Sequence, residues 1–305
     1  MGRERITRRK SVHDAKTLIT GAASGIGRAT ALAAAAQGAR LVLTDIDAAG
    51  LDATVAEVER NGGTVLFSRA LDIADYDAVS EFAAAVHEKV GSLDVVMNVA
   101  GTSIWGTVDK LEYRHWRRMV DINLMGPIHV IERFVPSMVR AGRGGALVNV
   151  SSAAGLLALP WHAAYSASKY GLRGLSEVLR FELAQHGISV HVVTPGAVNT
   201  PLVRSFDLVG LDKDHPRVQR LTARFAGHAV PPERVAAAIL RGIERNRFLV
   251  YSSFDIRFGY WWKRKFAFPY ELVMRLANVQ FSRLQKSLDR ERPQSVPAVE
   301  SSTSD

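Results

Sequence analysis

A tyrosine and a lysine stand four residues apart in the stretch AAYSASKYGL, which covers residues 163–172. In an α-helix this spacing places Tyr165 and Lys169 on one face, with side chains that lean the same way along the axis. A phenol beside an ammonium could exchange a proton with a bound molecule. The same pair also occurs on ordinary solvated helix surfaces, so other parts of the sequence must decide between these interpretations.

A glycine-rich turn, TGAASGIG at residues 20–27, follows the first apolar run of the chain and opens into a helical pattern. Its glycines allow a tight turn and a close approach of backbone amides and the helix N-terminus to a pyrophosphate. Asp45 ends the second apolar run, where its carboxylate could bind the ribose hydroxyls of adenosine. We therefore predict dinucleotide binding, and the turn residues assigned to the cofactor are Gly21, Ser24, Gly25, Ile26 and Gly27.

The choice of cofactor follows from charge. Asp45 would repel the 2′-phosphate of NADP, and neither Ser24 nor Ile46 supplies a cation for it, so NAD is preferred. Asp72, after the third apolar run, could accept a hydrogen bond from the adenine amino group, and Ile73 could pack on the ring. The alternative is that these carboxylates only cap strand ends or turns.

Composition restricts the class of protein. The 305 residues are 47% hydrophobic, which allows one large α/β domain or two smaller ones. Cysteine is absent, so there is no disulfide framework, thiol nucleophile or cysteine-based metal site, and we expect no metal. The sequence has no apolar run long enough to span a bilayer and its start does not resemble a signal peptide, so we expect a cytoplasmic location, with attachment to a membrane surface as an alternative.

The positive charge lies at the two ends of the chain. Of the net charge of +9, residues 1–16 carry +4 and residues 241–305 carry +5, so the region between them is neutral. This distribution favours terminal segments that meet an anionic surface, and we expect no nucleic-acid partner.

Short apolar runs alternate with helical patterns along the chain. The runs cover residues 16–21, 39–45, 64–72, 93–101, 145–152, 188–196 and 247–251. Continuous hydrophobic runs are typical of parallel strands covered on both faces, so the fold class is α/β, a doubly wound parallel sheet of Rossmann type. We place a basic arm at 1–15, the NAD-binding and catalytic domain at 16–251 with a substrate lid at 201–231, an amphipathic extension at 252–289 and a disordered tail at 290–305.

Over roughly residues 15–250 the chain resembles the short-chain dehydrogenase/reductase family. The resemblance rests on ordered motifs: TGAASGIG at 20–27, NVAG at 98–101, DINLMG around Asn123, VSSAAG at 150–155, YSASK at 165–169 and PGAVNT at 195–200. NVAG departs from the two consecutive asparagines usual in the family. The resemblance implies an oxidoreductase that acts as a homo-dimer or homo-tetramer, paired through the helices that carry Asn123 and Tyr165.

The resemblance also implies a catalytic tetrad of Asn123, Ser152, Tyr165 and Lys169. Ser152 is chosen over Ser151 because thirteen residues separate the serine from the tyrosine in the family. Tyr165 would be the acid/base, its pKa lowered from about 10 by the Lys169 cation. Ser152 would hold the substrate oxygen, Lys169 would also bind the nicotinamide ribose, and Asn123 would hold a water in a proton relay. The further cofactor contacts implied are Asn98, Ala100, Gly101, Tyr165, Lys169, Pro195, Gly196, Val198 and Thr200.

Residues expected near the substrate are mostly apolar and include no cluster of basic side chains. They are Ile104, Trp105, Leu156, Leu157, Leu159, Trp161, Leu202, Val203, Phe206 and Leu208. We therefore expect hydride transfer between NAD(H) and a lipophilic secondary alcohol or ketone, such as a steroid, retinoid or lipid. The alternatives are an NAD-binding scaffold or sensor without turnover and an NADP-dependent carbonyl reductase; these side chains could instead serve core or dimer packing.

Aromatic and basic residues meet in the extension. Tyr260, Trp261 and Trp262 precede the cluster Lys263, Arg264 and Lys265, a combination that suits a membrane interface. A predicted helical stripe follows, made of Val273, Leu276, Ala277, Phe281, Leu284 and Leu288. The alternative is a helix packed on the domain or across a dimer, and we expect the aromatic segment near the substrate entrance with the 270–288 helix packed on protein.

Overall fold

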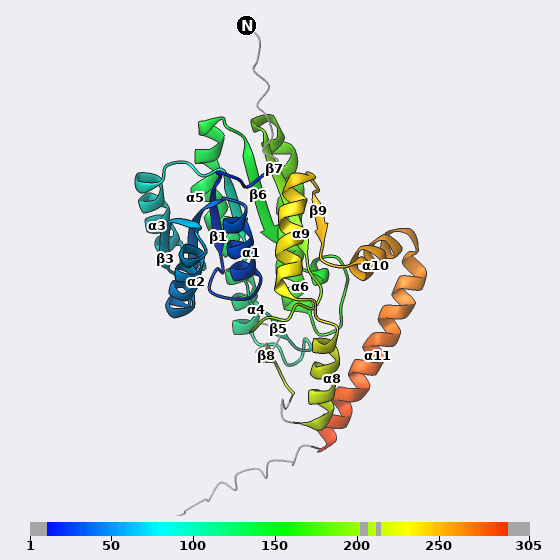
Figure 1. Cartoon of the computed structure of the whole chain (residues 1–305). Coiled ribbons are helices and arrows are strands. Elements are labelled where there is room, and N and C mark those ends of the chain that lie inside the picture. The colour runs from blue at the N-terminus through cyan, green and yellow to red at the C-terminus, as the bar shows by residue number, and fades with distance from the viewer. Residues whose placement is uncertain (1–10, 202–206, 212–214, 292–305) are drawn as a thin grey trace, which may run out of the picture.

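A computed structural model describes residues 11–201, 207–211 and 215–291 (Figure 1). The strands are β1 (Lys16–Thr20), β2 (Arg40–Asp45), β3 (Thr64–Ala70), β4 (Val95–Asn98), β5 (Ile104–Trp105), β6 (Gly145–Val150), β7 (Ile188–Thr194), β8 (Asp207–Leu208) and β9 (Leu249–Tyr251). The α-helices are α1 (Gly25–Ala36), α2 (Ala48–Arg60), α3 (Tyr76–Lys89), α4 (Tyr113–Val120), α5 (Gly126–Ala141), α6 (Ala163–Glu182), α8 (Pro216–Gly227), α9 (Pro232–Glu244), α10 (Phe254–Lys265) and α11 (Ala267–Glu291). A π-helical turn, Asp121–Met125, joins α4 to α5.

The described residues form a seven-stranded sheet in the order β3-β2-β1-β4-β6-β7-β9, and every neighbouring pair is parallel. Each of the predicted apolar runs contains one of these strands, so the predicted doubly wound sheet is confirmed. All residues of β4, β6 and β7 are buried, which explains their continuous hydrophobic pattern. The strand order reverses between β1 and β4, where folds of this kind bind ligands.

Helices cover both faces of the sheet (Figure 1). On one face α1, α2 and α9 pack against alternate strand residues such as Ile19, Leu43 and Val148. On the other face α3 and α5 cover the residues between them, including Leu18, Val42 and Leu147. The alternation of strand side chains therefore supplies two cores from one sheet.

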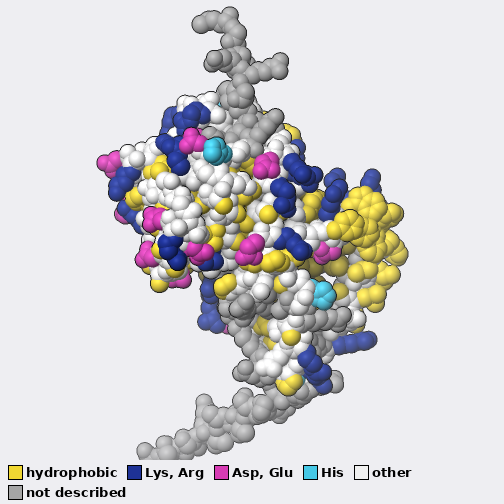
Figure 2. Space-filling model, viewed as in Figure 1, with side chains coloured by type: hydrophobic (Ala, Val, Ile, Leu, Met, Phe, Trp, Pro, Cys, Tyr) yellow, Lys and Arg dark blue, Asp and Glu magenta, His cyan; other side chains and the backbone are white. Residues whose placement is uncertain are grey.

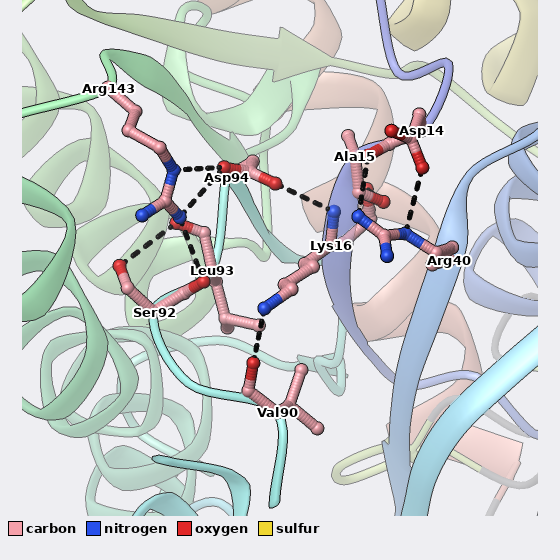
Figure 3. Close-up of polar contacts among 10 residues, drawn as sticks. Asp14, Ala15, Lys16, Arg40, Val90, Ser92, Leu93, Asp94 and Arg143 are labelled. Atoms are coloured by element: carbon pink, nitrogen blue, oxygen red, sulfur yellow. Dashed lines mark hydrogen bonds and ion pairs between the residues drawn. The ribbon is translucent and has the colours of Figure 1, made fainter. Parts of the chain in front are cut away.

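A polar cluster fastens the amino ends of the strands (Figure 3). The carboxylate of Asp94 accepts hydrogen bonds from the backbone N–H of Lys16 at 3.0 Å and from the Arg143 guanidinium at 3.1 Å. Arg40 pairs with Asp14, Nε to Oδ1, at 3.0 Å. These contacts join β1, β2, β4 and the start of β6 at the end of the sheet opposite the cavity described below.

Two boundaries differ from the predicted ones: the end of the N-terminal arm and the end of the C-terminal extension. Residues 11–15 were assigned to the basic arm, but Val12 and Ala15 are buried in the core; residues 1–10 lie outside the described residues. Within the predicted lid, residues 202–206 and 212–214 lie outside the described part, so nothing tests Leu202, Val203 or Phe206. The described parts of the lid are β8, which pairs with β5, and α8. Helix α11 continues to residue 291, and the predicted tail beyond it is not described.

The extension forms two helices whose inner faces pack on the domain. Tyr260, which one of the two interpretations places at a membrane interface, is only 9% exposed, and its hydroxyl accepts a hydrogen bond from Arg173 at 2.9 Å. Lys263 also points inward, because its Nζ donates to the Leu156 carbonyl at 2.7 Å and to the Tyr170 hydroxyl at 2.8 Å. Of the two interpretations of this segment, packing on the domain therefore holds for Lys263.

The apolar stripe of α11 is rotated from the predicted one. The Tyr270 hydroxyl accepts a hydrogen bond from the Ala158 N–H at 2.7 Å, and Phe281 stacks edge-on against Trp161 at 4.7 Å between ring centroids. Val273 and Leu276 point outward and are 43% and 57% exposed. The packed face thus follows Tyr270, Ala277 and Phe281, and the side chains of Leu284 and Leu288 are not among those described.

Candidate active site

A cavity of about 630 Å³ opens at the carboxyl ends of the strands. Its walls come from the segments that follow β1, β4, β6, β7 and β9, together with the start of α6. Ser152, Tyr165 and Lys169 line it, as do Ile26, Gly101, Pro195, Gly196, Val198 and Thr200 from the predicted cofactor set. Residues spread over the whole domain sequence therefore meet in one hollow.

The glycine-rich turn is packed too tightly for side chains. Gly21 has φ +73°, and a Cβ on it would lie 2.8 Å from the Ala100 backbone. A Cβ on Gly27 would lie 1.8 Å from the Gly21 carbonyl oxygen. The hydroxyl of Thr20 accepts hydrogen bonds from Val99 and Ala100 N–H at 3.0 and 3.1 Å, which holds the β4 loop against the turn. This leaves bare backbone at the N-terminus of α1, as a pyrophosphate requires.

Asp45 lies beside the turn. Its Oδ2 accepts the Ala23 N–H at 2.9 Å, and its Oδ1 accepts the Asp47 N–H at 3.0 Å. Ile46 is 71% exposed, and the nearest cation on α1, Arg28, pairs with Glu57. The carboxylate thus anchors the turn and keeps negative charge at the place where the ribose is expected.

Three predicted cofactor contacts have structural partners of their own. Asp72 accepts the Ala74 N–H at 2.9 Å, and Ile73 is a core residue, 5% exposed and packed against Gly126. Asn98, 1% exposed, does not line the cavity; its amide donates to Asn149 Oδ1 at 2.9 Å and ties β4 to β6. Ser24 is exposed at the N-cap of α1.

Tyr165 and Lys169 stand one turn apart on α6 and both face the cavity. Lys169 is 4% exposed, its Nζ donates to the Val150 carbonyl at 3.0 Å, and it lies 5.9 Å from the centre of the Tyr165 ring. Burial lowers the pKa of Lys169 from 10.5 to about 8. Tyr165 and Lys169 therefore do not lie on a solvated helix surface.

Burial also changes the pKa of Tyr165, in the direction opposite to the one expected. It raises the pKa of the phenol, and the hydrogen bond with Ser152 opposes that rise. The lowering of this pKa expected from Lys169 is not found, because the cost of burying the phenolate outweighs the hydrogen bond with Ser152. Only further stabilisation of the phenolate would bring its pKa toward neutrality.

The two adjacent serines have different surroundings. Ser151 is 3% exposed and its hydroxyl donates to the Lys169 carbonyl at 2.9 Å, so it fastens β6 to α6. Ser152 accepts the Ala154 N–H at 3.1 Å and hydrogen-bonds to Tyr165 in the cavity wall. The geometry thus favours Ser152 as the serine that meets a substrate oxygen.

Asn123 sits in the π-helical turn, fully buried. Its side chain makes two hydrogen bonds with the Thr102 backbone, accepting N–H and donating to the carbonyl, each at 2.9 Å. A Cβ on Gly101 would lie 2.9 Å from Asn123 Oδ1 and 3.3 Å from Lys169 Nζ. The missing side chain at Gly101 keeps the space between these two groups open.

The sequence did not single out His162, which lines the cavity beside Tyr165. Its Nδ1 lies 2.6 Å from the Pro160 carbonyl, and its ring centre lies 4.1 Å from that of Trp105. Burial lowers its pKa to about 4, so the imidazole is neutral near pH 7. In the sequence, the position of His162 three residues before the tyrosine of YSASK could have marked it as a cavity residue.

The predicted substrate residues divide into two groups. Trp105, Leu157 and Leu159 line the cavity. Ile104, Leu156 and Leu208 are instead buried in small cores around it, and Trp161 is buried against Phe281; none of the four lines the cavity. Ser253, Asp255 and Ile256 line the cavity too, so the start of α10 forms part of its wall.

Residues 15–208 match the sequence model of the short chain dehydrogenases. The chain belongs to this family. A relative from Mycobacterium tuberculosis, named as the oxidoreductase SadH, is 36% identical over 242 residues, which cover 79% of this chain and 86% of that protein. The 3-oxoacyl-acyl-carrier-protein reductase FabG of Thermotoga maritima is 35% identical over 223 residues, which cover 73% of this chain and 87% of FabG.

Solved dehydrogenases have the same architecture. A short-chain dehydrogenase of Mycobacterium paratuberculosis bound to NAD superimposes with a TM-score of 0.69 at 25% identity, covering 79% of this chain and 97% of that one. An alcohol dehydrogenase of Thermococcus sibiricus complexed with 5-hydroxy-NADP superimposes with a TM-score of 0.65 at 25% identity, covering 78% and 94%. This short-chain dehydrogenase is therefore an oxidoreductase of alcohols and ketones that uses a nicotinamide cofactor.

Proposed function

We propose that the enzyme oxidises a lipophilic secondary alcohol, or reduces the matching ketone, with NAD(H). The observation that carries this proposal is the convergence of Ser152, Tyr165 and Lys169 in one cavity whose substrate side is lined by Trp105 and Leu157. A nicotinamide cofactor bound there would take up or supply the hydride. Apolar walls favour an uncharged, lipophilic substrate such as a steroid, retinoid or lipid alcohol.

The protein's residues have separate roles in the proposed reaction. Ser152 donates a hydrogen bond to the substrate oxygen, and Tyr165 accepts the hydroxyl proton during oxidation and returns it during reduction. Tyr165 must be a phenolate to accept this proton and becomes one again when it returns it; Lys169 stabilises that phenolate and would contact the ribose of the cofactor. Asn123 completes a relay that resupplies Tyr165 with protons, through the space that Gly101 leaves open beside Lys169.

NAD rather than NADP is supported by Asp45, whose carboxylate would repel a 2′-phosphate at the ribose, and by the pairing of Arg28 with Glu57. The cofactor contacts would come from the turn at 20–27, from Ala100 and Gly101, and from the loop Pro195–Thr200. Asp72 and Ile73 remain predicted contacts of adenine, and Asn98 is proposed to act only by supporting the strand ends.

We also propose a homo-oligomer paired across α4, α5 and α6. Val178 and Phe181 on α6 are 55% and 72% exposed, which supports an apolar contact on that side. Among the described residues no helix is long and apolar enough to cross a bilayer. We further propose a peripheral contact with a membrane surface.

The deciding experiment is a panel of steroid, retinoid, terpenoid and long-chain secondary alcohols, assayed with NAD and with NADP by the absorbance of the reduced cofactor. Tyr165→Phe keeps the ring and removes the proton, so turnover should fall by about 10²–10⁴-fold while NAD binding stays nearly unchanged. Normal turnover in that variant would reject the mechanism. Turnover with NADP alone would favour the carbonyl reductase alternative, and NAD binding without any turnover would favour the sensor.

A further inference from the structure

An aromatic face covers the outer side of α10 and α11. On α10 it consists of Phe254, Phe258 and Trp261, which are 77%, 46% and 50% exposed. On α11 it continues with Phe268, Leu272 and Leu276, which are 77%, 50% and 57% exposed. We call these six residues the outer face. Figure 2 shows apolar side chains gathered over this part of the molecule.

The outer face is continuous on α10. The ring centres of Phe254 and Phe258 are 6.1 Å apart, and those of Phe258 and Trp261 are 5.7 Å apart. Domain packing does not explain the face, because the opposite sides of both helices already hold the anchors Tyr260, Lys263 and Tyr270. A contiguous apolar patch of this kind on a protein surface marks a site of contact.

The charge around the outer face is positive. Arg257, Arg264 and Lys265 are exposed on α10, whereas Asp255 is its one acidic residue. On α11 the exposed Glu271 is paired with Arg275, at 3.7 Å. Exposed aromatic rings flanked by cations match the interface of an anionic bilayer, where rings lie at headgroup depth and cations meet the phosphates.

We propose that the outer face of α10 and α11 docks on an anionic lipid surface, with both helices lying in the plane of the interface. A second copy of the chain is a poorer occupant. A two-fold contact places the same patch on both subunits, which would bring the cations of one copy toward those of the other.

Docking would also place the cavity beside the lipid. Ser253, Asp255 and Ile256 line the cavity, while the neighbouring Phe254 and Phe258 belong to the outer face, so α10 separates the two by its own thickness. A lipophilic alcohol could then pass from the bilayer to Tyr165 with little exposure to water. This second step rests on the proposed function, whereas lipid docking itself does not.

The test is co-sedimentation of the full-length protein with vesicles of equal parts phosphatidylcholine and phosphatidylglycerol. Phe254→Ser with Phe268→Ser removes two residues of the outer face that are each 77% exposed. The matched control, Val108→Ser, removes an apolar side chain that is 74% exposed and lies outside α4, α5 and α6. We expect the wild type and the control to bind, the Phe254/Phe268 variant to bind at least about tenfold more weakly, and added salt to weaken all binding.

Other outcomes would overturn the proposal. If the wild type stays in the supernatant at low salt, lipid is not the occupant, and if the Phe254/Phe268 variant binds as well as the control, a different surface meets the lipid. Light scattering of all three proteins identifies the second-copy alternative, in which only the Phe254/Phe268 variant would lose subunits. Turnover of a water-soluble secondary alcohol, assayed separately, reports on the proposed function and should be equal in the wild type and both variants.

Discussion

Replacing Lys169 by Met should stabilise the fold at neutral pH while it removes turnover. The lysine is 4% exposed, and burial lowers its pKa from 10.5 to about 8. At about 1.36 kcal/mol for each tenfold change in proton affinity, the buried charge costs the folded state about 3 kcal/mol near pH 7. Met fills a similar volume without that charge.

The lost hydrogen bond to Val150 opposes this gain. A hydrogen bond from a charged donor contributes about 1.5–3 kcal/mol, so we expect the free energy of unfolding of Lys169→Met to exceed that of the wild type by about 0–2 kcal/mol at pH 7. A loss of more than about 1 kcal/mol would contradict the cost assigned to burial.

The pH dependence gives a sharper test. Below about pH 8 both states of the wild type carry the charge, and the folded state bears the full cost. Between about pH 8 and 10.5 the folded protein has released the proton and the unfolded chain still holds it, so the wild type gains stability as pH rises. The advantage of Met should therefore shrink by about 2 kcal/mol from pH 7 to pH 9.5.

The assay is urea unfolding of the cofactor-free protein, followed by tryptophan fluorescence at both pH values. Lys89→Met, at an exposed position on α3, is the matched control and should give a difference that does not vary with pH. A constant difference for Lys169→Met as well would refute the reasoning, because the linkage between burial and proton release would be absent.

Three further predictions address the cofactor site and the extension. Asp45→Ser with Ile46→Arg should shift the ratio of kcat/KM values toward NADP by about 1–3 kcal/mol. The control Asp45→Asn keeps an acceptor for the Ala23 N–H and should only weaken the preference for NAD. A wild type that already prefers NADP would contradict this prediction. Gly27→Ala should lower the free energy of unfolding, measured with urea, by about 3 kcal/mol or more, because the added Cβ would lie 1.8 Å from a carbonyl oxygen. The control Gly174→Ala has open space around it and should be neutral or stabilising. Lys263→Met should loosen α10, seen as faster amide hydrogen exchange in residues 254–265 with no change in the central strands, and unchanged exchange would show that its two hydrogen bonds are not needed.

The sequence carried enough information for the sheet and for part of the cavity wall. Parallel strands such as β6 are buried on both faces, so their apolar runs are visible without any knowledge of their neighbours. The spacing of Tyr165 and Lys169 defines one helix face, and the turn at 20–27 needs glycine for reasons of local packing. These features depend on residues close together in the chain.

The features that the sequence did not predict depend on distant contacts. Lys263 points inward because Leu156 and Tyr170, 107 and 93 residues away, supply its acceptors. Ile73 is a core residue because α5 begins against it at Gly126. His162 reaches the cavity after a backbone reversal at Trp161, whose φ of +64° is rare for a side chain of that size.

The π-helical turn at Asp121–Met125 makes the length of the segment between α4 and α5 as important as its composition. The Gly126 N–H donates to the Asp121 carbonyl, five residues earlier, so the turn holds one residue more than a regular helix would. Because the turn already holds this extra residue, one further residue inserted in the segment would rotate α4 by about 100° relative to α5. Met119, fully buried on α4, and Phe134, fully buried on α5, could then no longer both face inward. An insertion should therefore be far more damaging in this segment than side-chain substitutions at its exposed positions.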